Sequence, residues 1–428
     1  MRRIIRFIKK ILRKAKKNNL QIDAKYILSN DAHPISNADI SSNALQTVTR
    51  LTKAGFQAYI VGGSVRDLLS GKSPKDFDIA TDATPQQVRK LFRNARIIGR
   101  RFKIAHILCH REIIEVTTFR GHASVNENQQ ANEHGILIRD NVYGSLEDDA
   151  WRRDFTINAL YYDANNESII DLTGGVSDVG HKHIRIIGDP SKRYREDPVR
   201  MLRAIRFTAK LQFTMTAETA APIARLAKLI LHVSGSRLFE ELLKLYHCGN
   251  AIRVQELLVQ YGLFALIFPQ IVAIENSNYP VNELLHLVLQ NTDQRIDAQK
   301  PVTPAFLYAT LLWFPLRVLT MQLQENGVEP LPALEQAMSL VIQRQNKIVI
   351  VPKRYTQVIR EIWLLQYRFV KRTGNRAYQL LQHPRFRAAY DFLALRALVG
   401  DAELELAEWW TLFQDVDDMT KKQMIDQL

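Results

Sequence analysis

The chain has 428 residues, enough for roughly two to four domains, and its hydrophobic content of 46% is ordinary for a globular protein. Lysine and arginine number 58 against 44 aspartates and glutamates, and the resulting charge of +14 favours a polyanionic partner. The two cysteines, Cys109 and Cys248, argue against a disulfide scaffold and a cysteine-based zinc site. No apolar run is long enough to cross a bilayer. We therefore expect a cytoplasmic protein with no disulfide partner.

The N-terminus is a basic arm. Residues 1–19 contain nine Lys or Arg and no acid, and their apolar residues fall near one face of a possible helix. Three interpretations stay open for this arm: a partly disordered solubilising tail, a segment that contacts RNA, and a helix that binds weakly at a membrane surface. Residues 20–40 are polar and predict a connector.

The following residues predict an α/β head. Residues 41–55 have the apolar spacing of a helix, and the short apolar run Ala58–Val61 predicts a strand. A second helix is expected over Thr84–Phe92, because threonine can cap it and proline suits its first position. Two more strands are predicted over Ile104–Leu108 and Ile113–Thr118.

The pattern changes after the head. Residues 121–141 are polar and predict an irregular loop, and beyond about residue 195 the chain reads as almost wholly helical. The predicted fold class is an α/β head with a short mixed β-sheet, followed by a mostly α-helical neck, body and C-terminal region. The predicted divisions are an arm and connector (1–40), the head (41–165), a neck (166–250), and a helical body with an RNA-binding C-terminal region (251–428).

A glycine turn follows the first predicted strand. Gly62 and Gly63 allow a sharp turn and a close approach of the backbone to a ligand. Ser64 is expected to cap the helix Val65–Leu69 that comes next. A strand, a glycine turn and a helix N-terminus together form an anion cradle.

Two aspartates lie shortly after this turn. Asp76 and Asp78 are two residues apart, so in an extended strand their carboxylates point to the same face. Like charges that close repel each other unless a cation lies between them. Either feature alone is usually a plain turn or a solvated loop, but their order and closeness predict a divalent metal site beside a phosphate site.

These motifs resemble a known family. In order along the chain they are Gly62-Gly63, Arg66-Asp67, Asp76-x-Asp78, Glu115–Arg120, Arg152–Ala159 and Glu196–Phe207. Together they are similar to the signature of the polymerase-β-type nucleotidyltransferases, and more closely to the class that holds bacterial poly(A) polymerases and tRNA CCA-adding enzymes. The resemblance covers residues 40–250.

The resemblance implies a catalytic site with Mg²⁺ as cofactor. Asp76 and Asp78 would be the metal ligands, and Glu115 the third catalytic carboxylate; taken without the resemblance, Glu115 reads as a strand-surface residue. The implied nucleotide-binding residues are Gly62, Gly63, Ser64, Arg66, Arg120, Arg152, Arg153, Asp154, Asp197, Arg200 and Arg203.

Some of these roles stay open. Arg152 and Arg153 would diverge by about 100° on a helix, so only one of them is expected to contact nucleotide. Asp154 could orient an arginine or meet the ribose.

Base choice is predicted from Asp197 and Arg200. Three residues apart, they would share one helical face. A carboxylate accepts from an exocyclic amino group and a guanidinium donates to a ring nitrogen, a pattern that adenine and cytosine both match. The pair therefore predicts selection of ATP or CTP over GTP and UTP. The competing interpretation is an ordinary salt bridge between neighbouring helical turns.

Two further segments favour the poly(A) polymerase branch. Ile97–Ile107 and His383–Leu393 resemble segments of bacterial poly(A) polymerases. Residues 341–396 hold twelve Lys or Arg against two acids, with aromatics interleaved. We expect most of these aromatics to pack in a core and many of the cations to contact RNA.

The predicted function is template-independent polyadenylation of RNA 3′ ends, with AMP taken from ATP and pyrophosphate released by a two-metal mechanism. Two alternatives stay open: a CCA-adding tRNA nucleotidyltransferase, and a non-catalytic adaptor that binds RNA or is tethered to a membrane.

Overall fold

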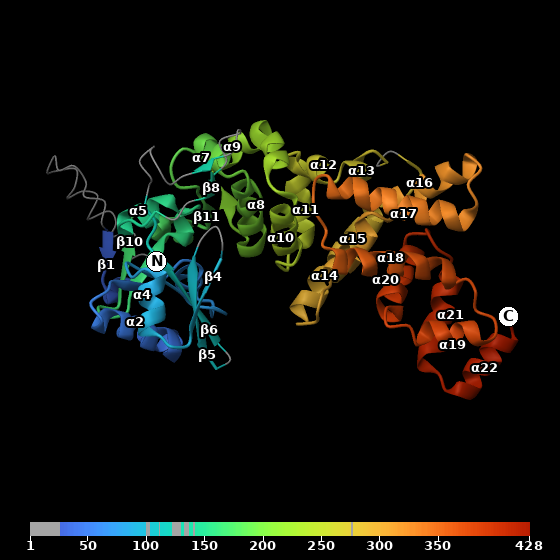
Figure 1. The fold of residues 1–428 in the computed structure, drawn as a ribbon, viewed down its shortest axis with the longest axis horizontal. Helices are drawn as coiled ribbons and strands as arrows, with labels where there is room; N and C mark the ends of the chain where they lie inside the picture. Colours follow the sequence, from blue (N-terminus) through green and yellow to red (C-terminus); the bar gives the residue numbers. More distant parts are fainter. Residues whose placement is uncertain are drawn as a thin grey trace. The chain divides into compact units, whose positions relative to one another are not determined.

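The computed structural model describes residues 26–99, 103–110, 112–121, 130–131, 137–139, 142–274 and 277–428. The chain divides into two compact units (Figure 1). The first unit comprises Met1–Arg200 and Gln212–Leu226, and the second comprises Met201–Leu211 and Ala227–Leu428. The predicted N-terminal arm and most of the predicted loop at 121–141 lie outside the described residues.

The first unit is built on one mixed sheet. Its eight strands follow the order β1-β10-β9-β2-β3-β6-β5-β4. Among the described strands of this sheet, β3 and β6 form the parallel pair and the other neighbours are antiparallel. The strands are β1 (Tyr26–Leu28), β2 (Ala58–Val61), β3 (Asp78–Thr81), β4 (Ala95–Ile98), β5 (Ile104–Cys109), β6 (Glu112–Thr118), β9 (Leu160–Asp163) and β10 (Ser168–Asp171).

Two small sheets complete the strand pairing of the described residues. One pairs β7 (Gln130–Ala131) with β8 (Leu137–Arg139), and the other pairs β11 (His183–Ile184) with β12 (Thr214–Met215).

Short helices connect and cover the strands of the first unit. The helices are α2 (Ser42–Lys53), α3 (Gly63–Leu69), α4 (Pro85–Leu91), α5 (Leu146–Arg152), α6 (Gly175–His181), α7 (Pro190–Glu196) and α9 (Ala217–Leu226), with the short 3₁₀ turns η1 (Asn30–Ala32), η2 (Asn37–Asp39) and η3 (Thr156–Asn158). Helix α8 (Val199–Leu211) begins in the first unit and continues into the second.

Several predicted elements are confirmed. The strand at Ala58–Val61 is β2, and the predicted helix at 41–55 is α2. Thr84 caps α4 as expected: its hydroxyl accepts the N–H of Gln87 at 3.4 Å, and Pro85 occupies the first helical position. These elements are determined by neighbouring residues, which is why the sequence alone predicts them.

The sheet is larger than the sequence predicts. Residues 26–28, expected in the connector, form β1, and residues 168–171, expected in the neck, form β10. The two pair antiparallel with Ile27 opposite Ile170. The two strands are only three and four residues long and are far apart in the sequence. Neither is therefore indicated by its local pattern.

The second unit is helical, as predicted. Its helices are α10 (Gly235–Tyr246), α11 (Ala251–Gln260), α12 (Leu263–Ile267), α13 (Pro269–Val272), α14 (Val281–Asp297), α15 (Pro304–Leu311), α16 (Trp313–Glu325), α17 (Pro330–Asn346), α18 (Lys353–Arg368), α19 (Asn375–Leu381), α20 (Phe386–Leu398), α21 (Leu404–Asp415) and α22 (Asp418–Asp426), preceded by the 3₁₀ turn η4 (Ala227–His232).

Aromatic side chains form much of the core of this unit. Trp363, Phe369 and Trp410 are fully buried, and the ring of Phe369 lies 5.2 Å from that of Trp410 in an edge-on arrangement. The indole N–H of Trp410 donates to the Phe369 carbonyl at 3.0 Å. The expectation that most aromatics between 341 and 396 pack in a core is confirmed, although Tyr367 is 42% exposed.

None of the described helices is by itself long and apolar enough to span a membrane, although α15 and α16 meet those two criteria as a pair bent by 48°.

Candidate active site

The glycine turn between β2 and α3 has the sharp backbone bend that its sequence suggests. Gly62 has φ +80° and ψ −124°, a conformation that favours glycine, and its N–H donates to the carbonyl of Leu160 at 3.0 Å. A Cβ at Gly62 would lie 3.5 Å from Arg153 Nη1 and 3.5 Å from the Asn158 carbonyl oxygen. The turn therefore brings the backbone against two neighbouring segments.

The predicted role of Ser64 as the helix cap is wrong. Helix α3 begins at Gly63 with Gly62 as its N-cap, two residues earlier than the expected start at Val65. Ser64 lies inside the first turn, is 5% exposed, and donates to the Val61 carbonyl at 3.4 Å. The positive φ of Gly62 starts the helix, so no side-chain cap is needed at Ser64.

Asp76 and Asp78 stand at the start of β3, beside the glycine turn. β3 begins at Asp78, so Asp76 precedes the strand rather than lying within it as expected. The alternation nevertheless extends back to Asp76: Phe77 and Ile79 are buried, whereas Asp76 is exposed and Asp78 half-buried. Asp78 pairs with Val61, the residue immediately before Gly62, so the carboxylate and the turn are adjacent.

Glu115 completes a group of three carboxylates. It lies on β6 directly opposite Asp78 in the parallel pairing, and its side chain is 45% exposed. Burial and then the negative charge of Glu115 raise the pKa of Asp78 to about 6; Asp76 acts in the same direction, against the opposing effects of Arg153 and His106. Glu115 and Asp76 therefore both lie close enough to Asp78 to disfavour its ionised form.

His106 borders this group from β5. It pairs with Glu115 across the antiparallel strands, and its Nε2 lies 3.2 Å from Glu115 Oε1. In the described structure His106 Nε2 is buried and has no hydrogen-bond partner. A protonated His106 would offset part of the negative charge.

We call Asp76, Asp78 and Glu115 the carboxylate group. It suits a divalent cation whose coordination is completed by substrate oxygens. Among the described residues, no three His, Cys, Asp or Glu side chains form a ready metal cage. Magnesium is usually held by one or two carboxylates together with substrate phosphates, so Asp76 and Asp78 fit that ion.

Arg153 is locked beside Asp78 by a buried network. Its guanidinium donates to Asp149 Oδ2 at 3.1 and 3.0 Å and to the Tyr161 hydroxyl at 3.0 Å, while that hydroxyl donates to Asp149 at 2.7 Å. Burial alone would lower the pKa of Arg153, but Tyr161 and Asp149 hold it above its ordinary value. Arg153 thus places a fixed positive charge near the carboxylates.

Arg66 is also held inside the head. Its guanidinium donates to Asn158 Oδ1 at 2.6 Å and to Asp67 at 2.9 Å, and the residue is 4% exposed. Asp154 Oδ1 accepts from Asn158 Nδ2 at 3.2 Å and from the N–H of Phe155 at 2.9 Å. Asp154 therefore orients Arg66 through Asn158, one of the two roles that the sequence left open for it.

Arg152 diverges from Arg153, as predicted. Arg152 ends α5 and its Nη1 donates to the Gly121 carbonyl at 2.7 Å, whereas Arg153 lies beyond the helix with ψ 165°. Burial, followed by the positive charges of Arg120, Arg193 and Arg200, lowers the pKa of Arg152 to about 10. We call Arg120, Arg152, Arg193 and Arg200 the arginine group; the charges of the other three lower the pKa of Arg152, and Glu196, which contacts Arg193 and Arg200, acts in the opposite direction.

The predicted base-reading pair is not on one helix. Asp197 is the C-cap of α7, with φ −149° and ψ 95°, and α8 begins at Val199. The reason is Pro198, because a residue that precedes proline avoids the helical region. The backbone N–H of Arg200 donates to the Asp197 carbonyl at 3.0 Å, and its Nη1 contacts Glu196 Oε2 at 3.1 Å and the Arg193 carbonyl at 2.8 Å.

Arg203 belongs to the second unit, where its guanidinium lies 5.4 Å from the ring centre of Phe207. Its predicted contact with nucleotide stays a prediction.

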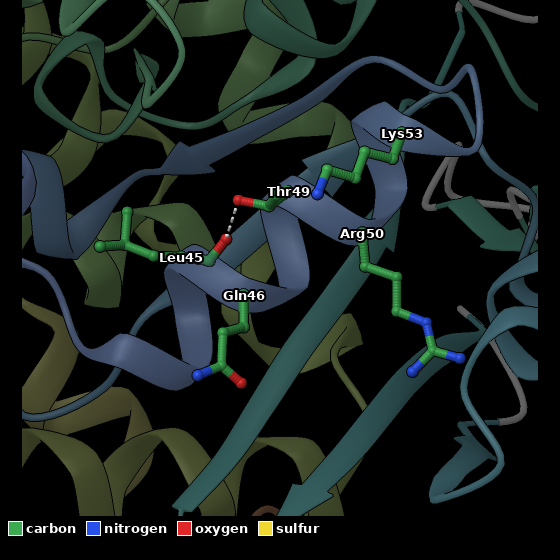
Figure 2. A pocket seen from close by; sticks show the side chains of 5 residues that line it. All are labelled: Leu45, Gln46, Thr49, Arg50 and Lys53. Atoms are coloured by element: carbon green, nitrogen blue, oxygen red, sulfur yellow. Dashed lines mark hydrogen bonds between the residues drawn. The ribbon is translucent and has the colours of Figure 1, made fainter.

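A hollow of about 380 Å³ lies along the outer side of α2 (Figure 2). It is lined by Leu45, Gln46, Thr49, Arg50 and Lys53. None of these is a predicted site residue. The Thr49 hydroxyl donates to the Leu45 carbonyl at 2.8 Å. We assign no ligand to this hollow.

The sequence interpretation missed five residues that position the site. Asp149 could have been found from its i,i+4 spacing to Arg153 on a helix, and Asn158 lies within one of the recognised motifs. Glu196 opens another recognised motif and has i,i+3 and i,i+4 spacing to Arg193 and Arg200, so its contacts also carried a local signal. The contacts of Arg193 with the carbonyls of Arg152 and Arg153 join distant segments and carry no local signal, and nothing local marks the contacts of Tyr161. These residues are Asp149, Asn158, Tyr161, Arg193 and Glu196.

Three family models match the chain in succession. The Poly A polymerase head domain matches residues 58–185, the model described as a probable RNA and SrmB-binding site of polymerase A matches 212–274, and the polymerase A arginine-rich C-terminus matches 326–428.

Whole proteins are also similar over their full length. Poly(A) polymerase I of Salmonella typhi is 47% identical over 438 residues, which cover 100% of this chain and 94% of that protein. The chain belongs to the bacterial poly(A) polymerase I family. Poly(A) polymerase I of Haemophilus influenzae is 45% identical over 402 residues, covering 92% and 89% of the two chains. Family membership confirms the prediction of a polynucleotide adenylyltransferase.

CCA-adding enzymes are more distant members of the same class. The CCA-adding enzyme of Bacillus pumilus is 40% identical over 216 residues, half of each protein. The solved structure of the Bacillus stearothermophilus CCA-adding enzyme in complex with CTP matches with a TM-score of 0.58 and 26% identity, covering 86% of this chain and 80% of that one. A CCA-adding enzyme in its apo form II matches at 0.63 with 18% identity, covering 91% and 88%, and shows the shared fold alone. The predicted fold class is therefore confirmed.

Proposed function

We propose that this poly(A) polymerase family member adds AMP from ATP to RNA 3′ ends without a template and releases pyrophosphate. The observation that carries the proposal is the combination of a carboxylate group and an arginine group within one compact unit. The first suits cations and the second suits a triphosphate, the two charged components of a nucleotidyl transfer.

The carboxylate group is assigned the metal chemistry. Asp76 and Asp78 would hold Mg²⁺, with Glu115 as the third catalytic carboxylate. Bound divalent cations supply acidification of the attacking 3′-hydroxyl and offset the charge on the pyrophosphate that leaves. The raised pKa of Asp78 supports this assignment, because a carboxylate that is difficult to ionise alone is stabilised by a cation.

Two members of the arginine group, Arg120 and Arg152, are assigned the triphosphate. Guanidinium groups suit phosphate oxygens because they donate two parallel hydrogen bonds. Arg120 and Arg152 are the proposed contacts, since their positive charges oppose each other and an anion would relieve that repulsion. Arg66 and Arg153 act instead as positioning residues, holding the glycine turn against Asn158 and a charge near Asp78.

Base choice is assigned to Asp197, between α7 and α8, and to Arg200, in the first turn of α8. Arg200 would donate to a ring nitrogen and Asp197 would accept from an exocyclic amino group, which adenine satisfies. Cytosine satisfies the same pattern, so this pair does not by itself distinguish ATP from CTP. The full-length similarity to poly(A) polymerase I, against half-length similarity to CCA-adding enzymes, supports ATP.

RNA is proposed to contact the exposed cations of the second unit. Lysine and arginine neutralise phosphates without regard to base sequence, which suits a substrate defined only by its 3′ end. The exposed cations between 341 and 396 are Arg344, Lys347, Lys353, Arg354, Arg368, Lys371, Arg376, Arg385 and Arg387. Arg396, by contrast, is 8% exposed and bonded to Asp401, so it is a core residue.

The deciding experiment compares products on two RNAs. The purified chain is given an unstructured RNA or a tRNA that lacks its CCA end, with ATP or CTP and magnesium. Long A tracts on both RNAs support the proposal. A single short CCA end confined to the tRNA, or no incorporation of labelled ATP by the unmutated chain, contradicts it.

A matched variant tests the role of the carboxylates. Replacing both Asp76 and Asp78 by alanine should abolish AMP incorporation and leave RNA affinity nearly unchanged, because the proposed RNA contacts lie in the second unit. Filter binding with the same RNA measures the affinity, and incorporation that survives in the double variant refutes the metal assignment.

A further inference from the structure

Arg193 is a buried arginine of α7 to which the proposed function assigns no contact with nucleotide. It is 8% exposed, and its Nη2 donates to the carbonyl oxygens of Arg152 at 2.7 Å and Arg153 at 2.6 Å. These carbonyls end α5, where a helix leaves its acceptors without partners inside the helix. One guanidinium nitrogen therefore fixes the backbone of both arginines at the C-terminal end of α5, Arg152 and Arg153.

The same guanidinium also reaches the base-reading side. Arg193 Nη1 donates to Glu196 Oε2 at 2.9 Å, and that oxygen also accepts from Arg200 Nη1 at 3.1 Å. Arg200 Nη1 donates in addition to the backbone carbonyl of Arg193 at 2.8 Å. Both acceptors that hold the Arg200 guanidinium are therefore placed by Arg193.

The orientation of Arg193 leaves one of its own donors unpaired. In the described structure its Nε is buried and has no hydrogen-bond partner. A buried donor without a partner is unfavourable, so the side chain is oriented for the two carbonyls and Glu196 at the expense of Nε. Such an orientation requires a planar fork with several donors in fixed directions, which arginine has and lysine does not.

We propose that Arg193 is a positioning residue that sets the spacing between Arg152, on the triphosphate side, and Arg200, on the base side. The inference rests on the proposed function, in which these two arginines contact the two ends of one nucleotide. A rigid link between them makes base choice depend on correct placement of the triphosphate. When the triphosphate is placed correctly, a mismatched base is out of position for its contact with Arg200.

The alternative is that Arg193 only packs α7 against α5. Both roles predict some loss of stability when Arg193 is changed, so stability does not distinguish them. Discrimination between ATP and GTP does, because packing alone leaves the ratio of their kcat/KM values unchanged.

The experiment uses three variants of the full chain. Arg193→Lys keeps the charge and removes the fork; Glu196→Gln weakens the link to Arg200 but keeps the hold of Arg193 on α5. Arg225→Lys is the matched control. Arg225 is an exposed residue of α9, and its guanidinium donates at 3.2 Å to Ser191 Oγ on α7, the helix that carries Arg193. For each variant, kcat and KM are measured with ATP and with GTP on one RNA, together with inhibition by inorganic tripolyphosphate.

Arg193→Lys should lower the ATP to GTP ratio of kcat/KM by about tenfold or more and weaken tripolyphosphate inhibition, because both ends of the link are loosened. Glu196→Gln should lower the ratio by a similar factor and leave tripolyphosphate inhibition within about twofold of the unmutated chain. Arg225→Lys should change neither quantity.

The contrary results are equally specific. If Arg193→Lys lowers only kcat or the melting temperature and the ratio stays within about twofold, Arg193 is a packing residue and the inference fails while the proposed function stands. If Arg193→Lys does not fold, an unchanged ratio in Glu196→Gln overturns the inference. If the unmutated chain adds no AMP at all, the proposed function and this inference both fail.

Discussion

Replacing Asp78 by asparagine should make the metal-free protein more stable while removing its activity. Burial and the charge of Glu115 raise the pKa of Asp78 to about 6, against an ordinary value of 3.8. A group whose pKa is raised by folding stabilises the folded state fully below its unfolded pKa, and that contribution is lost as pH rises through the folded pKa.

The magnitude follows from the two pKa values. A difference of roughly two pKa units corresponds to about 3 kcal/mol, so at pH 8 the ionised Asp78 lowers the free energy of unfolding by up to about 3 kcal/mol relative to a neutral amide. At pH 5 the folded protein has bound the proton, and the penalty falls to about half of that. The amide in Asp78→Asn has no charge at either pH.

The assay is urea unfolding in EDTA at pH 8 and pH 5, followed by a signal from the first unit. Asp78→Asn should gain stability at pH 8 and gain less at pH 5, and added magnesium should stabilise only the unmutated chain. Glu147→Gln is the control, because Glu147 is an exposed carboxylate of the same unit. If Asp78→Asn is less stable than the unmutated chain at pH 8, or gains equally at both pH values, the electrostatic argument for the carboxylate group is refuted.

Three further substitutions test the surrounding structure. Gly62→Ala should lower the free energy of unfolding by about 1 kcal/mol or more, because alanine disfavours φ +80°, and thermal melting measures it. Tyr161→Phe should lower it by about 1–3 kcal/mol and raise the KM for ATP, since Arg153 and Asp149 both lose a partner; an unchanged melting curve would contradict the network. Trp410→Ala should cost about 3–5 kcal/mol in the second unit, seen as early loss of its helical CD signal, while nucleotide binding to the first unit persists.

The parts of the fold that depend on neighbouring residues could be predicted from the sequence. The strand at Ala58–Val61 has a continuous apolar run, and the helix after Thr84 has both a cap and a proline at its first position. The family resemblance implied that Glu115 is the third catalytic carboxylate, but its parallel pairing with Asp78 was not predicted. Register across a crossover connection is determined by the whole sheet, and no local pattern specifies it.

The parts that could not be predicted depend on distant partners or on proline. β1 is defined by β10, far away in the sequence, and Arg193 by carbonyls on another helix. The placement of Asp197 outside the helix was available in principle, since Pro198 follows it, but the i,i+3 spacing to Arg200 suggested a shared helical face. Ser64 was misplaced because a serine near a helix start suggests a cap, whereas the helix begins two residues earlier, after Gly62 with its positive φ.

The parallel pairing of β3 with β6 limits which insertions and deletions this head can tolerate. Neighbouring side chains of a strand point to opposite faces, and Ile114 and Val116, on either side of Glu115, are both buried. Removing a single residue from β6 would move one of them opposite Asp78 and turn the glutamate into the interior of the sheet. Natural variation in chain length should therefore accumulate in the segments that join the two strands. Insertion or deletion of one residue within β6 should eliminate both folding and activity.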